Sequence, residues 1–557
     1  MHLPTTLKKA MTRGNDLRHT TGYLLKRNLR LSVLVLLALF TIYYFGDILL
    51  RASEKYFWYD ELVTVYLCRL PTLGDIHQAV IHATDFNPPL FYVVTRISQS
   101  LFGEGLITTR LPEILGFWLL CLSLFAFVYR KAGLLAGFIA MTLPMLSEAY
   151  YYAYEARPHG IVLGCCGLAL LCWQLYLDNS RKTWLALFSL CLLAAFMNHC
   201  YALVSAVPFG LAELVRSWRR KQIDWKMWAA LTSPTIIACA IFIPLLRSYK
   251  AGVAGTQFGV TYFQPSWWSA FTFYFGLVSP CVVVVVVMFL LFAIDTLRPP
   301  ALARSAGLFE LGLEELTLAC SFLLLPFFGV LAGKLVHGPF IPRYFMSTVI
   351  GFCLLVSFMV RAPRTRNRTA ILLTAVIVAL LARTSLLLVW HRMHGVGEKL
   401  YEAGTGMLLE TTPGNPLKGY SLLTANMEAN NRPVAILWTL DFLYLTYYAP
   451  RILPRLYYVS CSSDAESLRA IHVVRQWTRG NYNAERSCGE FVSSNRDFLT
   501  FGFLGTDAFK MLQVGATIQS STVKVRTGRF FARMRGNPEA KRLEKALPQE
   551  KPGTDIE

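Results

Sequence analysis

The stretch from Trp58 to Tyr92 reads WYDELVTVYLCRLPTLGDIHQAVIHATDFNPPLFY and lies between two long apolar runs. It carries more ionisable groups than the apolar segments around it, among them the adjacent carboxylates of Asp60 and Glu61. Acidic side chains beside a bilayer are costly unless they face water, protein or a substrate. Aromatic side chains, which suit the membrane interface, alternate with these charges. An ordinary solvated loop is the alternative, but the pattern favours an acidic loop held at the membrane surface, able to act on a substrate that is half lipid.

The composition of the chain is that of a membrane protein. Of its 557 residues, 54% are apolar and 16% are charged, whereas soluble domains have about a quarter charged residues. The net charge is +20, but the basic residues cluster in short loops between apolar runs, where they set the orientation in the membrane. No nucleic-acid-binding motif is present. We therefore expect a polytopic membrane protein without a nucleic-acid partner.

Runs of about 20 apolar residues can cross the bilayer as helices. We predict about eleven such spans: Leu31–Leu50, Leu106–Tyr129, Leu134–Leu146, His159–Leu177, Trp184–Met197, Tyr201–Val215, Met227–Leu246, Trp268–Leu297, Leu316–Leu331, Tyr344–Val360 and Ala370–Trp390. The first follows a basic segment and is too long for the core of a signal peptide, so we expect an uncleaved anchor. Asn87–Phe102 is apolar but short and could lie along the interface.

Every second loop is short and basic, whereas the other loops are longer and carry the acidic residues. Because basic residues favour the cytoplasmic side, this alternation predicts a cytoplasmic N-terminus and places the loop containing Asp60 outside. An odd number of spans then places the C-terminal region outside as well. We expect the protein in the inner (cell) membrane of a bacterium, with a periplasmic or extracellular C-terminal domain.

The predicted fold is mainly α-helical, with a small C-terminal α/β domain. Its parts are a basic cytoplasmic N-terminus (1–30), a transmembrane domain (31–391) with a catalytic first outer loop (51–105), an extracytoplasmic α/β domain (392–525) and a charged, loose tail (526–557). The α/β domain is predicted from two β-prone runs, Pro433–Trp438 and Arg455–Ser460, around a helix from Asp441 through Tyr448. A helix over Asp464–Trp477 and a strand over Thr517–Val525 follow.

Cysteine usage agrees with this organisation. Eleven of the 13 cysteines lie at or before Cys353, nearly all in apolar spans, where a thiol packs as a small residue. Only Cys461 and Cys488 lie in the predicted outer domain. Because the exterior of a bacterial cell is oxidising, we hypothesise that these two form a disulfide.

Further candidate site residues lie at the predicted outer face. Glu155 and Arg157 occur in YYYAYEARPH at 150–159, His199 occurs between two short spans, and Arg343 and Tyr344 begin the tenth span. A guanidinium group can bind a phosphate through two parallel hydrogen bonds. The alternatives are ordinary: interfacial anchors for the arginines and tyrosines, and a packing or turn residue for the histidine. An acid at the same face could deprotonate an acceptor while cations stabilise a departing phosphate.

Five motifs occur in a fixed order along roughly the first 390 residues: WYDE, NPPLFY, YEARPHG, NHCYALV and IPRYFMS. They resemble motifs of membrane glycosyltransferases of the GT-C superfamily, and the similarity is greatest to the bacterial branch related to the protein O-mannosyltransferases and the lipid A aminoarabinose transferase. The resemblance implies a polyprenyl-phosphate sugar donor and transfer with inversion on the outer face. It carries the family's first-loop aspartate to Asp60, with Glu61 beside it, and two arginines to Arg157 and Arg343. Where the family often has histidine before the proline pair, this chain has Asn87.

We therefore predict a hexosyl- or pentosyltransferase that moves a sugar from a lipid-phosphate donor to a protein, lipid or glycan acceptor. Asp60 would be the general base, and Glu61 would support a metal ion, a sugar hydroxyl or the loop. A divalent metal ion (Mg or Mn) could be held through Asp60, Glu61 or His199, although no ligand spacing indicates one. The alternatives are a transporter or flippase of a lipid-linked sugar, which would place ionisable groups near the membrane midplane, and an inactive scaffold.

Overall fold

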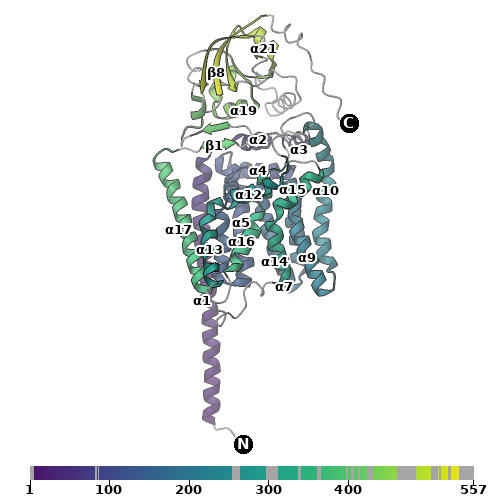
Figure 1. Ribbon diagram of the computed structural model, residues 1–557, viewed down its shortest axis with the longest axis vertical. Coiled ribbons are helices and arrows are strands. Elements are labelled where there is room, and N and C mark those ends of the chain that lie inside the picture. Colours follow the sequence, from purple (N-terminus) through teal and green to yellow (C-terminus); the bar gives the residue numbers. More distant parts are fainter. Residues whose placement is uncertain are drawn as a thin grey trace.

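The computed structural model shows a bundle of helices with a small α/β domain at one end and the N-terminus at the other (Figure 1). The structure describes residues 5–81, 85, 87–253, 264–296, 312–336, 340–360, 366–396, 399–402, 407–411, 414–421, 423–424, 431–460, 485–503, 512–513, 516–524 and 529–538. Helix α1 (Thr5–Glu54) enters the bundle and extends beyond it at the end opposite the α/β domain.

Seven helices among the described residues are long and apolar enough to cross a membrane. They are Arg30–Glu54 of α1, α5 (Leu106–Ala132), α7 (His159–Asn179), Cys200–Arg220 (η3 and α9), Trp225–Ile243 of α10 (Trp225–Val253), Trp267–Leu291 (α12, η4 and part of α13) and Ile371–Met393 of α17 (Arg366–Met393). Two bent pairs could each form a further span, Leu134–Leu146 with Glu148–Tyr154 and Leu313–Leu323 with Leu325–Leu335. Two shorter apolar helices are α8 (Lys182–Asn198) and α16 (Thr348–Met359). Each predicted span corresponds to one of these segments, so the polytopic helical fold is confirmed.

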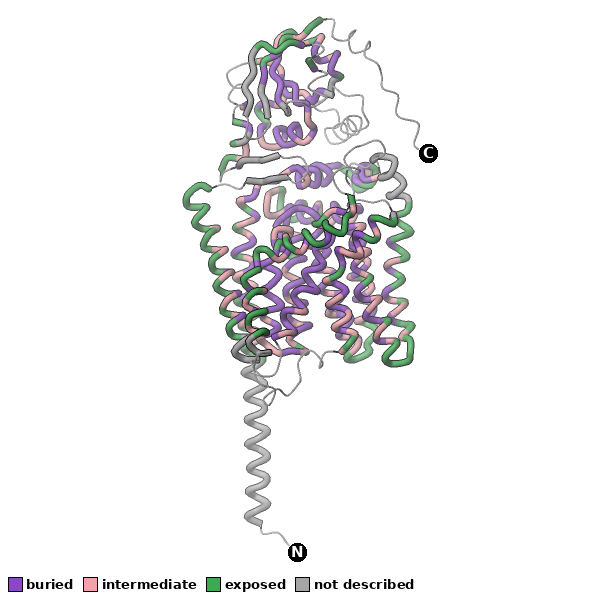
Figure 2. The backbone as a smooth tube through the Cα atoms, in the orientation of Figure 1, coloured by how far each residue is buried: buried purple, intermediate pink, exposed green. Residues whose placement is uncertain are grey.

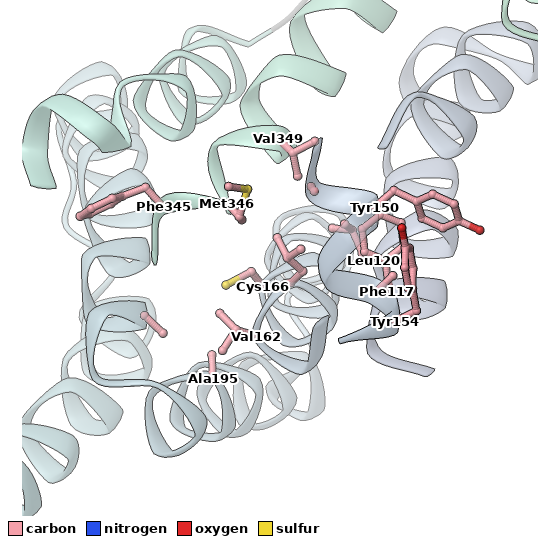
Figure 3. Close-up of a cluster of buried hydrophobic side chains, with 14 of the residues drawn as sticks. Phe117, Leu120, Tyr150, Tyr154, Val162, Cys166, Ala195, Phe345, Met346 and Val349 are labelled. Carbon is pink, nitrogen blue, oxygen red and sulfur yellow. The ribbon is translucent and has the colours of Figure 1, made fainter. Parts of the chain in front are cut away.

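Helices α5 and α7 form the centre of the bundle. In each of these two helices, 67% of the most apolar stretch is buried. In α17, at the periphery, only 17% of that stretch is buried, and the difference can be followed in Figure 2. A Cβ atom added at Gly164 of α7 would lie 2.3 Å from the carbonyl oxygen of Gly116 in α5. Such small residues allow two helix backbones to touch. Figure 3 shows the side chains beside this contact, including Phe117 and Leu120 of α5 and Val162 and Cys166 of α7. The contact fixes the start of α7 relative to α5.

The predicted first outer loop, 51–105, folds into short helices between the bundle and the α/β domain (Figure 1). These are α2 (Tyr59–Cys68), α3 (Leu73–Ile81) and α4 (Pro89–Phe102). Helix α4 begins at Pro89, because proline lacks the N–H group that the first turn leaves unpaired. It ends at Phe102, and the next residue, Gly103, has a φ of 83°, a conformation that glycine adopts without strain.

The C-terminal domain contains a six-stranded sheet. Its strands, in spatial order, are β5 (Glu485–Ser487), β4 (Leu456–Ser460), β3 (Val434–Ile436), β6 (Asp497–Phe503), β8 (Arg529–Gly536) and β7 (Ala516–Lys524). Strands β3 and β4 are parallel and are connected through α19 (Thr439–Tyr448). The predicted β-α-β unit is therefore confirmed. A separate pair, β1 (Lys399–Glu402) and β2 (Met407–Glu410), lies nearer the bundle (Figure 1).

The structure differs from the sequence prediction for the stretch 526–557, which was assigned to a loose, charged tail. Strand β8 lies inside this stretch and pairs antiparallel with both β6 and β7. Ala532 and Met534 are buried, while Arg533 alternates with them and pairs with Asp497 of β6 at 2.9 Å. The charges that suggested a tail therefore lie on the outer face of a strand, and the domain extends at least to Gly536. The predicted helix Asp464–Trp477 lies outside the described residues.

One cysteine of the predicted disulfide, Cys488, is the first residue of α21 (Cys488–Ser494). Cys488 is disulfide-bonded, and Cys461 lies outside the described residues. Pairing of these two cysteines remains a prediction, and it would close a loop of roughly 28 residues, worth on the order of 3 kcal/mol in the chain-entropy account. Peptide mapping without reductant should yield the linked pair. Two free thiols in protein exported normally would contradict the pairing.

Candidate active site at the end of the bundle

Asp60 lies in the first turn of α2 at the end of the bundle that carries the C-terminal domain. Its Oδ2 is 2.9 Å from Nη2 of Arg343 and 3.9 Å from Nε of Arg157. Arg343 belongs to the short helix η7 (Pro342–Phe345), and Arg157 lies between η2 (Glu148–Tyr154) and α7. The Asp60 side chain is 23% exposed and that of Arg343 is 26% exposed. Three residues predicted from separate motifs therefore meet in one cluster that a ligand could reach.

Glu61, the neighbour of Asp60, faces the interior of the bundle. Its carboxylate is fully buried and accepts two hydrogen bonds from Arg110 of α5, at 2.7 and 2.9 Å. The backbone N–H of Ala156 donates a third at 2.7 Å, and Nζ of Lys55 lies 3.6 Å away. Burial raises the pKa of Glu61, but the charges of Arg110 and Lys55 outweigh burial and lower it overall. Glu61 is thus an ion-paired anion that attaches α2 to the bundle.

Asp85 belongs to the cluster although the sequence motifs did not single it out. Arg157 donates two hydrogen bonds to its carboxylate, at 2.6 and 3.3 Å. Tyr92 and Asn87 donate to the same carboxylate, at 2.7 and 3.3 Å. The signal was present in the sequence, because Asp85 is an acid two residues before the Asn87-Pro88-Pro89 motif. The predicted site residue Asn87 therefore contacts Asp85, and Arg157 is held by two residues of the first outer loop, Asp60 and Asp85.

Glu155 is buried next to the cluster and accepts a hydrogen bond of 2.6 Å from the indole N–H of Trp58. Burial raises the pKa of Glu155 above its ordinary value, and the repulsion from Glu61 and Asp60 adds to this, against the attraction of Lys55 and Arg343. The Trp58 ring also lies 5.9 Å from the guanidinium carbon of Arg343. Glu155 thus positions a ring that borders the exposed arginine.

His199 follows α8 in a tight connection and is buried against Tyr344, with ring centroids 4.5 Å apart. Tyr201 packs on Tyr344 at 4.7 Å. Burial, together with the charges of Arg157 and Arg343, lowers the pKa of His199 to about 3. Its imidazole is therefore neutral and adds no positive charge for a phosphate. His199 and Tyr344, both predicted from the sequence as substrate ligands, form an aromatic support next to Arg343.

An apolar groove of about 520 Å³ adjoins the cluster. It is lined by His77, Ile81, Pro88, Pro89, Leu90, Met197, Ile241 and Leu245, from the loop of α3 and α4 and from helices α8 and α10. Pro88 directly follows Asn87, and Met197 lies two residues before His199. The groove and the charged cluster therefore use neighbouring residues of the same two stretches of chain.

No protein-family model and no curated protein matches the sequence. Two crystal structures of ArnT from Cupriavidus metallidurans are similar. The apo structure has a TM-score of 0.53 and 13% identity, over 93% of this chain and 99% of that chain. The structure bound to undecaprenyl phosphate has a TM-score of 0.52 and 12% identity, over 90% and 97%. The fold is similar to that of ArnT.

The similarity to ArnT covers the helical bundle and the C-terminal domain together. The resemblance seen in five short motifs is therefore matched by a similarity in fold that extends over most of the chain. At 13% identity the ArnT-like fold does not by itself define the chemistry of this chain.

The metal ligands considered from the sequence do not come together. Among the residues that the structure describes, no three or more His, Cys, Asp or Glu side chains are grouped so that they could hold a metal ion. Asp60 faces Arg343, Glu61 faces Arg110, and His199 packs on Tyr344. A metal ion bound by these three residues would require different side-chain positions.

Proposed function

We propose that this protein transfers a sugar from a polyprenyl-phosphate donor to an acceptor at the outer face of a bacterial membrane, with inversion at the anomeric carbon. The observation that carries the proposal is the partly exposed side chain of Asp60, 2.9 Å from Arg343 at the end of a helical bundle similar to that of ArnT. The undecaprenyl phosphate bound in one of the similar ArnT structures supports a lipid-linked donor. The acceptor is a lipid, a glycan or a protein, and the mass spectrometry described below distinguishes these three classes and gives the mass of the transferred sugar.

Asp60 is the proposed general base. A sugar or lipid hydroxyl is a poor nucleophile at neutral pH, so transfer needs a base within hydrogen-bonding distance. In the proposed step the hydroxyl proton passes to Asp60 while the oxygen attacks the anomeric carbon. The bond from that carbon to the phosphate oxygen breaks, and the phosphate leaves with the electron pair. One base and no covalent intermediate are sufficient for inversion.

Arg343 and Arg157 are proposed to stabilise the departing phosphate. Arg343 is the more accessible of the two, with 26% of its side chain exposed, against 8% for Arg157. Asp85 holds Arg157 in place, and Tyr92 in turn holds Asp85. The Arg157 guanidinium therefore does not have to move when negative charge builds on the phosphate. Arg343 would therefore contact the phosphate, and Arg157, whose charge is partly balanced by Asp85, would add a smaller stabilisation from a fixed position.

The apolar groove beside the cluster is the proposed place for the first isoprenoid units of the donor. Its lining is almost entirely hydrocarbon, with His77 as the exception. Burial of apolar surface contributes about 25 cal/mol per Å², so even a short length of isoprenoid would add substantially to binding. The lipid would then hold the phosphate next to Arg343 while the sugar faces Asp60.

Mass spectrometry of outer-surface lipids, glycans and proteins should test the function. Cells that produce the protein should contain a sugar-modified product that is absent without it, and Asp60→Asn should abolish the product while the protein level remains normal. A flippase would move the lipid-linked sugar with Asp60→Asn as well, because translocation needs no general base. Persistence of the product with Asp60→Asn would therefore contradict the proposed transfer reaction.

The proposed orientation can be tested with cysteine labelling. The structure puts Arg219, at the end of α9, and Lys418 of the C-terminal domain among exposed residues. A cysteine in place of Lys418 should react with a membrane-impermeant maleimide in intact cells, and a cysteine in place of Arg219 should react only after the cells are opened. Labelling of the Arg219 position from outside would reverse the orientation and remove the basis for outer-face transfer.

A further inference from the structure

The face of α2 that points away from the bundle packs on the C-terminal domain. Tyr59 donates a hydrogen bond of 3.3 Å to Oδ1 of Asp441, which is fully buried in the first turn of α19. Tyr420 donates to the same oxygen, and its hydroxyl lies 3.4 Å from that of Tyr59. We call Tyr59, Tyr420 and Asp441 the hydroxyl–carboxylate cluster.

Aromatic rings surround this cluster. The ring of Tyr59 meets Trp438 edge-on at 5.0 Å and Tyr444 at 6.3 Å. Tyr420 stacks on Tyr444 at 5.2 Å. A carboxylate that is removed from water is costly unless donors satisfy it. The two hydroxyl groups therefore have a strong tendency to remain on Asp441, and this constrains the position of Tyr59.

The opposite face of α2 is held by the bundle. Glu61 is paired with Arg110, and the hydroxyl of Thr64 donates to the carbonyl oxygen of Ala156 at 3.0 Å. Residues 59 and 61 are thus fixed by two different parts of the protein. Asp60 lies between them in sequence. Of the side chains of residues 59, 60 and 61, that of Asp60 alone points toward Arg343.

We propose that the C-terminal domain positions the general base, with Tyr59, Tyr420 and Asp441 as positioning residues for Asp60. The proposal rests on the proposed function, in which Asp60 accepts the proton. Rotation of α2 about its axis would carry Asp60 away from Arg343 and from the acceptor. A displacement of about 1 Å in a reacting group is enough to slow catalysis severely. The cluster prevents such rotation without touching the substrate.

The test compares Tyr59→Phe, Asp441→Asn and the double variant in full-length protein reconstituted into liposomes. The substrates are a panel of undecaprenyl-phosphate sugars, an extract of outer-surface lipids, glycans and proteins supplies the acceptor hydroxyl, and release of undecaprenyl phosphate is the assay. Each single variant should lower kcat about tenfold while KM changes less than twofold, because a misplaced base affects the transition state and leaves donor binding intact. The double variant should be no slower than the slower single variant, because both remove one interaction.

Tyr66→Phe is the matched control. It removes a hydrogen bond of 3.2 Å from α2 to the carbonyl oxygen of Leu443 in the same interface, further along α2 from Asp60. Its kcat should remain within twofold of wild type. Tyr420→Phe serves as a second test of the cluster if Asp441→Asn fails to fold. Hydrogen exchange of the α2 amides in purified protein should accelerate in the cluster variants and remain unchanged in Tyr66→Phe.

The outcomes separate the two proposals. Unchanged kcat in the cluster variants, an equal loss in Tyr66→Phe, or a loss confined to KM would overturn the positioning role. Hydrogen exchange does not depend on turnover, so it remains a test even when the panel lacks the natural sugar. Unchanged exchange of the α2 amides in the cluster variants would overturn the positioning role. Wild-type turnover in Asp60→Asn would instead refute the proposed function, whatever the cluster variants do.

Discussion

Asp60→Asn is expected to lower sugar transfer by about 100-fold or more, the usual scale of general-base catalysis. The amide is nearly isosteric with the carboxylate and can remain next to Arg343, 2.9 Å away in the wild-type protein. It cannot accept the proton of the acceptor. Expression, thermal stability and binding of undecaprenyl phosphate should stay near their wild-type values. Turnover should be measured with purified protein, so that protein level and activity are separated.

Glu61→Gln is the matched control, since it makes the same chemical change at the adjacent residue. Glu61 is fully buried and paired with Arg110 and Lys55. Breaking such a pair from one side costs about 3–5 kcal/mol, because it leaves buried cations without their anion. We therefore expect loss of folded protein, with the activity per folded molecule much less affected than in Asp60→Asn. A fully folded Glu61→Gln protein without transfer activity would exchange the roles of the two acids.

Arg343→Lys is expected to lower kcat by about tenfold or more. Lysine keeps the charge but has a single ammonium group in place of the planar fork of N–H donors. At present the fork reaches Asp60, and in the proposed complex it must also serve the phosphate. The loss should appear in kcat at least as much as in donor affinity, because negative charge on the phosphate increases as the bond breaks. Steady-state kinetics with an undecaprenyl-phosphate sugar and direct binding of undecaprenyl phosphate would measure the two effects.

Arg157→Lys provides the comparison within the same cluster. Its guanidinium makes two hydrogen bonds to Asp85, so the lysine variant should lose stability as well as turnover. Arg343→Lys should lose turnover alone, because its side chain and that of its partner Asp60 are both partly exposed. Full turnover in both lysine variants would reduce these arginines to structural or interfacial residues.

The hydropathy of the chain was sufficient to predict the membrane domain, because the length of an apolar helix is imposed by the thickness of the bilayer. Every predicted span corresponds to a long helix, a bent pair or a short apolar helix of the structure. The β-α-β unit around α19 was also predicted, since local residue preferences and short connections define it. The resemblance of five short motifs to the GT-C superfamily pointed to Asp60, Arg157 and Arg343, which the structure brings together.

For β8, the prediction of a loose tail from its charged composition was wrong. Its arginines alternate with buried residues such as Ala532 and Met534, and the strand is stable only because β6 and β7 lie on either side. A charged stretch with this alternation is equally compatible with a loose tail until those neighbours are known. Strand pairing over such separations is a property of the folded chain, since each strand is only marginally stable alone.

The sequence by itself determined that this chain crosses the membrane many times and that its ionisable groups gather beside the first span. Only the tertiary structure decided which partner each of those groups has. Asp60 and Glu61 are adjacent, yet they point about 100° apart around a helix axis, so one meets Arg343 and the other Arg110. Asp85 meets Arg157, which is 72 residues away. Hydropathy acts along the chain, whereas the pairing of charges depends on which helix faces come into contact, and that contact exists only after folding.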